Sequence, residues 1–140
     1  RTGQLTRELG QGYVCPVNLL EIIRPEKHTR TTQINAANGL HTTFIDDDFG
    51  EFTFVEHNLT VGEICHEEHG VLPNDPHSAT SLCRWHSRQA RPGWQIDIYT
   101  RLMVTCDANN FYLDASLEAL ENGQQVHIKT WQEKVSRGFS

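Results

Sequence analysis

The sequence predicts an all-β fold, an antiparallel β-sandwich of jelly-roll type, and three observations favour it. Apolar and polar residues alternate over several segments, and this period of two is typical of strands with one buried face. Turn-forming Gly, Asn, Asp and Pro residues separate the segments, and the pattern contains no long amphipathic helix. A sheet with one apolar face also needs a second layer to cover it, which a sandwich supplies. A small closed β-barrel is the alternative architecture.

The longest alternating segment spans residues 94–106. One side of this segment carries Trp94, Ile96, Ile98, Thr100, Leu102, Val104 and Cys106. The polar cluster at residues 107–110 ends the segment and predicts a turn. Two further alternating segments follow at residues 111–120 and 124–131. Asn122-Gly123 joins them and is a strong hairpin signal, because both turn positions need a positive φ. The C-terminal half is therefore predicted to be a three-stranded antiparallel meander.

The two predicted turns fix the register of this meander. A four-residue loop at residues 107–110 pairs Cys106 with Phe111, and a two-residue turn pairs Glu121 with Gln124. The apolar pairs that follow are Val104 with Leu113, Leu102 with Ala115, Ile98 with Ala119, Ala119 with Val126 and Leu117 with Ile128. The pairs predicted on the other side are Arg101 with Ser116 and Glu118 with His127. A slip of one residue would send half of the apolar set to solvent.

Residues 111–120 also fit a helix. Leu113, Leu117 and Leu120 have helical spacing, and the alanine, leucine and glutamate residues of this segment favour helices. The hairpin signal and the match across two strands favour a strand here instead.

Further strands are predicted at residues 40–45, 51–56, 59–69 and 78–86, with an acidic turn at residues 46–50 and a turn at residues 73–76. Residues 13–23 fit either a strand interrupted at Pro16 or a short helix over residues 19–23. The length fits one domain, residues 1–140, with residues 1–12 as a flexible N-terminal tail.

Composition excludes some function classes. The chain has 12 Lys and Arg residues against 18 Asp and Glu residues, a net charge of −6, and this acidity argues against a nucleic-acid partner. No apolar segment approaches the roughly 20 residues of a membrane-spanning helix, and residues 1–11 lack the apolar centre of a secretory signal. The four cysteines form no C-x-x-C pair. We therefore expect reduced structural cysteines, a cytoplasmic location and no cofactor.

Three motifs within residues 44–139 carry a family resemblance. The first is Asp75-Pro76-His77-Ser78-Ala79, which leads to a strand ending near Trp85. The second is the strand opened by Trp94, which contains Thr100-Arg101 and Thr105-Cys106-Asp107-Ala108 and continues into Phe111-Tyr112-Leu113. The third is Leu117-Glu118-Ala119 with Glu121, followed by Val126 and Trp131-Gln132-Glu133. Together they resemble the C-terminal part of the cocaine-esterase and X-Pro dipeptidyl-peptidase family of serine hydrolases, mainly its bacterial members.

The resemblance implies a supporting role. In that family a jelly-roll sandwich packs on an α/β-hydrolase domain that carries the Ser-Asp-His triad. This chain matches only the sandwich part, and its sequence contains no G-x-S-x-G nucleophile elbow. No catalytic residue is therefore transferred. The resemblance implies an accessory module of an esterase or peptidase, which packs on a catalytic α/β-hydrolase domain or subunit or associates with itself.

Ligand-type residues cluster at residues 65–69, where Cys65, His66 and His69 are weak candidates for a zinc site. Their spacing argues against one site, because His66 and His69 would face opposite sides of a strand and the H-E-x-x-H pattern is absent. Asp46, Asp47 and Asp48 lack the spacing of a calcium loop, so a plain acidic turn is favoured.

Four residues are candidates for contact with a ligand or partner: Trp131, Tyr112, His127 and Glu118. The predicted register puts Trp131 on the side opposite Val126 and Ile128, where a large aromatic residue would be exposed. A β-bulge that turns Trp131 inward is the competing interpretation. Glu118 beside His127 would suit either a surface cross-strand pair or acid-base chemistry. Alternative functions are a β-barrel that binds a small apolar ligand and a small enzyme with a His/carboxylate pair in such a barrel.

Overall fold

A computed structural model describes residues 19–138 of the chain, and these residues form eight antiparallel strands. The strands are β1 (Leu20–Arg24), β2 (Lys27–Ile34), β3 (His41–Phe54), β4 (Leu59–Leu72), β5 (Asp75–Arg91), β6 (Trp94–Cys106), β7 (Asn110–Glu121) and β8 (Gln124–Ser136). A 3-10 turn at Val55–His57 links β3 to β4. Residues 19–138 contain no helix with the length and apolar character needed to cross a membrane.

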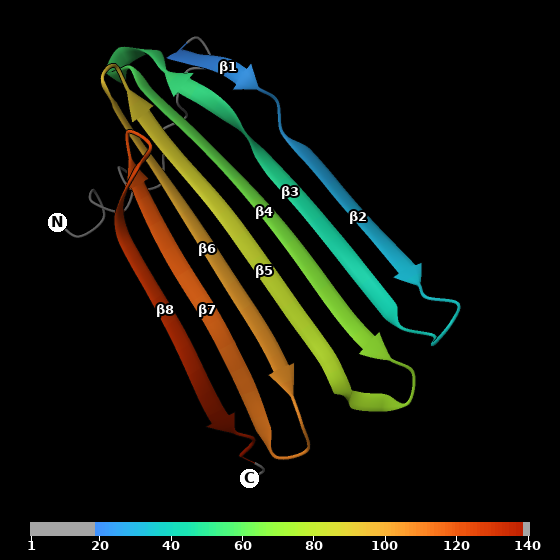
Figure 1. Cartoon of the computed structure of the whole chain (residues 1–140). Helices are drawn as coiled ribbons and strands as arrows, with labels where there is room; N and C mark the ends of the chain where they lie inside the picture. The colour runs from blue at the N-terminus through green and yellow to red at the C-terminus, as the bar shows by residue number, and fades with distance from the viewer. Residues whose placement is uncertain (1–18, 139–140) are drawn as a thin grey trace, which may run out of the picture.

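All eight strands belong to one sheet (Figure 1). Seven of them follow the order β1-β3-β4-β5-β6-β7-β8, and β2 pairs with β3 along the same edge as β1. The all-β antiparallel class is confirmed. Strands β1 and β2 at one edge do not pair with β8 at the other, so the closed barrel is wrong. From β3 onward each strand pairs with the next, and no connection within residues 19–138 crosses to a second sheet. The described residues therefore form one layer, which needs a second layer to complete a sandwich.

Strand β3 continues through the acidic residues where a turn was predicted. It pairs with β2 through residues 41–48 and with β1 through residues 51–54. The register shifts between Asp48 and Glu51, where Gly50 has a φ of +83°. A bulge thus replaces the predicted turn, since the glycine accommodates the change of direction without ending the strand. Strand β2 was not predicted, because its sequence, KHTRTTQI, shows no apolar alternation, and its residues are exposed throughout.

The predicted hairpin of β6 and β7 is confirmed in register. Cys106 lies opposite Phe111, Val104 opposite Leu113, and Arg101 opposite Ser116. Residues 111–120 lie within strand β7, so their helical spacing is not realised. The turn at Pro73-Asn74 is confirmed as well, with Asn74 at a φ of +60°, although β4 and β5 both extend closer to it than expected.

The predicted register of β8 is correct for Gln124 and Gln125 and wrong by one residue from there on. A bulge leaves Val126 without a partner in β7, because Leu120 pairs with Gln125 and Ala119 pairs with His127. Glu118 consequently lies opposite Ile128 and on the other face from His127. The bulge also turns Trp131 to the apolar face, where it lies opposite Ala115. This position agrees with the competing interpretation, in which a β-bulge turns Trp131 inward.

The expectations for the N-terminal region are tested in part. Of the two alternatives for residues 13–23, the strand is confirmed from Leu20 onward, and residues 13–18 lie outside the described residues. The predicted tail, residues 1–12, also lies outside them.

The register divides the sheet into two chemically different faces. The apolar face carries most of the large hydrophobic side chains, namely Ile22, Phe52, Phe54, Val61, Cys65, Cys83, Trp85, Ile96, Ile98, Leu102, Val104, Leu113, Leu117, Trp131 and Val135. The charged or ionisable residues Asp47, Glu63, Glu67, His69, Lys129 and Glu133 lie on it as well. The polar face carries Arg24, Asp46, Asp48, Glu51, His66, Glu68, Arg84, His86, Arg88, Asp97, Arg101 and Asp114. Strand alternation with a period of two produces this division.

Candidate functional site

The apolar face is not covered by any part of residues 19–138. Cys65, at 1% exposure, is the one buried hydrophobic residue among them. Large side chains near the middle and the edge of this face remain exposed, including Trp85 at 37%, Leu102 at 37% and Val135 at 49%. An exposed apolar surface that extends over several strands is typical of a surface that binds a partner.

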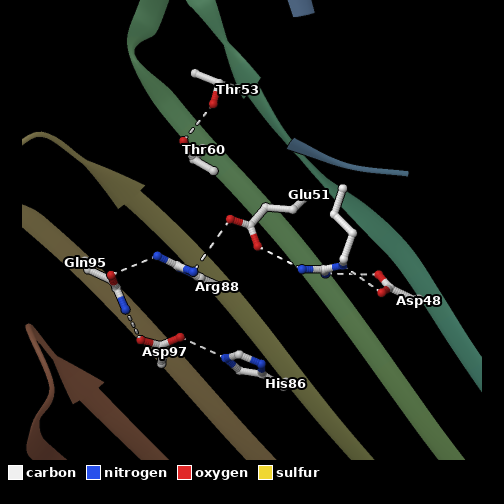
Figure 2. Close-up of polar contacts among 9 residues, drawn as sticks. Asp48, Glu51, Thr53, Thr60, His86, Arg88, Gln95 and Asp97 are labelled. Carbon is white, nitrogen blue, oxygen red and sulfur yellow. Dashed lines mark hydrogen bonds and ion pairs between the residues drawn. The ribbon is translucent and has the colours of Figure 1, made fainter. Parts of the chain in front are cut away.

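The polar face carries a continuous chain of hydrogen bonds and ion pairs across β1, β3, β5 and β6. Figure 2 shows its members, which begin at Asp48 and end at His86. The successive contacts are Arg24 with Asp48 and Glu51, Glu51 with Arg88, Arg88 with Gln95, Gln95 with Asp97, and Asp97 with His86. Opposite charges alternate along this chain, so each carboxylate has a cationic or amide partner. The arrangement ties four strands together, and within the described residues Arg88 Nε is its one buried nitrogen without a hydrogen-bond partner.

Asp97 and His86 form a histidine–carboxylate pair on this face. The Asp97 Oδ1 lies 2.8 Å from His86 Nε2, and Asp97 is 9% exposed. The imidazole stacks on Tyr99 with ring centroids 4.3 Å apart. Burial opposes ionisation of Asp97, but hydrogen bonds from Gln95 and His86 outweigh it and hold the pKa of Asp97 below its ordinary value.

A second histidine lies between two carboxylates. His66 Nε2 lies 2.9 Å from Glu68 Oε1, and its Nδ1 contacts Asp46. Both ring nitrogens face acceptors, an arrangement that favours the doubly protonated ring. The hydrogen bonds to Asp46 and Glu68 accordingly raise the pKa of His66 above its ordinary value.

Neither histidine has the partner that nucleophilic catalysis needs. The hydrogen bonds of residues 19–138 include none between a serine hydroxyl and a histidine ring. A nucleophile within hydrogen-bond reach of its base is the diagnostic feature of that chemistry. The described part of the chain therefore holds two ordered histidine–carboxylate groups but no catalytic triad.

Ligand-type side chains meet at one point on the apolar face. Cys65 Sγ lies 3.9 Å from Cys83 Sγ and 3.6 Å from Glu67 Oε1. Glu67 Oε2 accepts a hydrogen bond from His69 Nε2 at 2.8 Å. Burial, followed by the negative charge that Cys83 and Glu67 would add, raises the pKa of the Cys65 thiol to about 12. The thiol is therefore protonated and unreactive as long as no cation accompanies the group.

The four predicted contact residues divide between the two faces. Trp131 and His127 lie on the apolar face, opposite Ala115 and Ala119. Tyr112 and Glu118 lie on the polar face. Tyr112 borders a hollow of about 350 Å³, and Glu118 borders one of about 280 Å³. The structure thus does not bring these four residues together, and their role in binding stays a prediction.

The weak zinc candidates are separated in the same way. Cys65 and His69 share the apolar face, whereas His66 points to the polar face, as the strand spacing predicts. The cluster instead contains Glu67, which lies in the predicted cluster at residues 65–69 but was not singled out, and Cys83, which sequence reasoning missed as a ligand. The C-x-E-x-H spacing at residues 65–69 is the signal that was available, since alternate residues of a strand share a face. The position of Cys83 depends on the pairing of β4 with β5.

Comparison of the chain with protein-family models, with curated proteins and with solved structures found no match.

Proposed function

We propose that this chain is a noncatalytic β-sheet module whose apolar face packs on a catalytic α/β-hydrolase domain or subunit. The observation that carries the proposal is an eight-stranded sheet with most of its large hydrophobic side chains on one face, which residues 19–138 leave uncovered. Burial of apolar surface is favourable by about 25 cal/mol per Å², so an uncovered face of this extent favours association. The resemblance of residues 44–139 to the C-terminal part of esterases and peptidases supports a hydrolase as the partner.

The chemistry of the polar face supports a noncatalytic role. Its histidines and carboxylates bind one another in pairs, and no serine hydroxyl among residues 19–138 reaches an imidazole. A hydrolase partner would supply the nucleophile, and this chain would pack against the catalytic domain as a supporting β-sheet. The free thiols of Cys65, Cys83 and Cys106 agree with a reduced, cytoplasmic location, which is part of this proposal.

The first test is the coding DNA around this sequence. We expect a serine hydrolase domain with a G-x-S-x-G nucleophile elbow, either in the same reading frame or in an adjacent gene. That domain is then co-expressed with the chain, and their association is measured by affinity capture and light scattering. The proposal fails if no such domain is encoded there, or if the two do not associate and the chain forms only a dimer with itself.

Two substitutions on the edge strand β8 provide a matched test of the interface. Val135 lies on the apolar face and is 49% exposed, whereas Ile128 lies on the polar face and is 57% exposed. Because a carboxylate buried at an interface without a partner costs a few kcal/mol, Val135→Asp should weaken association about tenfold or more. Ile128→Asp should leave it unchanged. Equal effects of the two substitutions would show that the apolar face is not the interface.

A further inference from the structure

The strand register gathers two thiols, a carboxylate and an imidazole from two neighbouring strands. Cys65, Glu67 and His69 are alternate residues of β4, so their side chains project from the same face. Cys83 of β5 lies directly opposite Glu67 on that face. Cys65 Sγ, Cys83 Sγ and a carboxylate oxygen of Glu67 all lie within 4.8 Å of one another. Thiolate, carboxylate and imidazole are the side chains from which zinc sites are built.

The separations fit the edges of a zinc coordination tetrahedron. Bond lengths of about 2.3 Å to sulfur and about 2.0 Å to oxygen give edges of about 3.8 Å between two sulfurs and about 3.5 Å between sulfur and oxygen. The structure has 3.9 Å between the two sulfurs and 3.6 Å between Cys65 Sγ and Glu67 Oε1. The two edges that meet at Cys65 therefore already have the lengths of a coordination tetrahedron, and the third, between Cys83 and Glu67, lies within 4.8 Å.

A disulfide fits this geometry less well than a metal. Cys65 lies directly opposite Trp85, so Cys83 is its diagonal neighbour across the strand pair. Diagonal residues are about 7–8 Å apart, and the Cα atoms of a disulfide are usually within about 6.8 Å. Closing the bond would need a movement of the backbone in the middle of a regular ladder.

We propose that Cys65, Cys83 and Glu67 bind a divalent cation of the zinc class, and that His69 positions the carboxylate. His69 Nε2 donates to Glu67 Oε2 and leaves Oε1 directed at Cys65. Such an outer hydrogen bond orients a metal ligand. Three protein ligands leave a fourth position for a water molecule. Binding releases the thiol protons, because cysteine coordinates as the thiolate.

The surroundings of the cluster favour a bound cation over a charged side chain. Ile45 lies opposite Glu67 in β3, and Leu102 lies opposite Cys83 in β6. Asp47 lies opposite Cys65, but it bonds to His28 Nδ1 at 2.9 Å. Among residues 19–138, no Lys or Arg forms a salt bridge with Glu67. The nearest partners of Glu67 and Cys83 across the sheet therefore place no cation beside them that would compete with a bound metal ion.

Cobalt(II) titration of the full chain, reduced and free of oxygen, tests the site. We expect one equivalent to produce a thiolate-to-cobalt charge-transfer band in the near ultraviolet and the visible bands of tetrahedral cobalt, and zinc should displace it. Cys65→Ser and Cys83→Ser should each abolish or strongly reduce the charge-transfer band. Cys106→Ser is the matched control and should retain the full signal, since the Cys106 thiol hydrogen-bonds to the backbone carbonyl groups of Pro76, His77 and Ala79 and not to the cluster.

Two further variants separate a ligand from a positioning residue. Cys65 is buried, so its replacement can also lower stability, but Glu67 and His69 have side chains 30% and 41% exposed. Glu67→Gln should weaken cobalt binding and alter the visible bands, whereas His69→Ala should weaken binding by about 10- to 100-fold with the bands unchanged. The proposal is wrong if the reduced chain gives no charge-transfer band, or if the band survives in Cys83→Ser. It does not depend on the hydrolase partner, because the isolated chain is sufficient for the measurement.

Discussion

Arg24 and Asp48 form a bidentate ion pair that joins β1 to the bulge of β3. Arg24 Nε donates to Asp48 Oδ2 at 2.7 Å, and Nη2 donates to Oδ1 at 3.0 Å. The third guanidinium nitrogen, Nη1, donates to Glu51 Oε2 at 3.0 Å on the other side of the bulge. One arginine therefore binds the carboxylates that flank Gly50, and a planar guanidinium is well suited to such a fork.

Replacement of Arg24 should loosen this edge of the sheet. We expect Arg24→Met to lower the free energy of unfolding by about 1 kcal/mol, a modest amount because the side chain is 38% exposed and its ion pairs are screened by water. Urea unfolding followed by circular dichroism gives the value. Arg30→Met is the control, since Arg30 of β2 makes no salt bridge with another residue of 19–138. An equal loss in both variants would contradict a specific role for Arg24.

Asp107 should keep its charge to unusually low pH. The hydroxyl of Tyr112 donates to its Oδ2 at 2.6 Å, and the backbone amides of Asn109 and Asn110 donate to its Oδ1. The Tyr112 hydrogen bond, followed by that from Asn109, lowers the pKa of Asp107 to about 2. Tyr112→Phe should therefore raise the pKa of Asp107 towards its ordinary value, as measured by NMR titration of the carboxyl carbon. Tyr99→Phe is the control and should leave it unchanged.

The same carboxylates set the direction of the pH dependence of stability. The pKa values of Asp48 and Asp107 are lower in the folded chain than their ordinary value, the first mainly because of Arg24. Their stabilisation is complete above the unfolded pKa near 3.9 and is lost as the pH falls through the folded pKa values. The urea midpoint should fall as the pH decreases from about 4 to about 2. The urea midpoint of Asp48→Asn should fall less steeply with pH in this range. A pH slope equal to that of the unaltered chain would contradict the role of Asp48.

Gly50 and Gly93 both have a positive φ, but their surroundings differ. A Cβ on Gly50 would lie 2.8 Å from the backbone oxygen of Arg24, whereas a Cβ on Gly93 meets nothing within 4 Å. Gly93→Ala should therefore lower the free energy of unfolding by about 1 kcal/mol, the cost of an alanine in the left-handed conformation. Gly50→Ala adds a clash with backbone and should cost about 2 kcal/mol or more. Thermal unfolding of the two variants measures the difference, and equal losses would show that the bulge relaxes freely.

The sequence predicted the parts of the fold that local rules determine. Alternation and the turn at residues 107–110 were sufficient to place Val104 opposite Leu113, because register follows from strand period and loop length. The bulge at Gly50 was not predicted, and the bulge at Val126 entered only as the competing interpretation of Trp131, since each depends on contacts between strands rather than on the residues themselves. The single layer was also beyond prediction, because alternation shows which face is apolar but not what covers it.

The cysteine cluster shows the same limit at the level of a site. Cys65, Glu67 and His69 follow the period of one strand and can be grouped from the sequence. Cys83 is eighteen residues away from Cys65, and its place beside them depends on the length of the turn between β4 and β5. The predicted strand limits, 59–69 and 78–86, left that turn too long to give a register. The proposed metal site therefore depends on the pairing of the two strands, which the sequence alone does not determine.

The bulge at Val126 leads to a prediction about deletion. Because Leu120 already pairs with Gln125 and Ala119 with His127, removal of Val126 should give a regular ladder and keep Trp131 opposite Ala115. The free energy of unfolding should change by no more than about 0.5 kcal/mol, and the NOE between the Trp131 ring and the Ala115 methyl group should remain.

An alanine inserted between Lys129 and Thr130 is the contrasting variant. With the bulge already present, the extra residue turns Trp131 to the polar face and removes that NOE, and it should lower stability clearly. A regular hairpin without the bulge would give a different result for the first variant. There, Trp131 would lie opposite Asp114 before the deletion, and loss of Val126 would turn it to the apolar face, opposite Ala115. An NOE that is absent in the unaltered chain and appears only in the deletion variant would therefore refute the bulged register and the position of Trp131 on the apolar face.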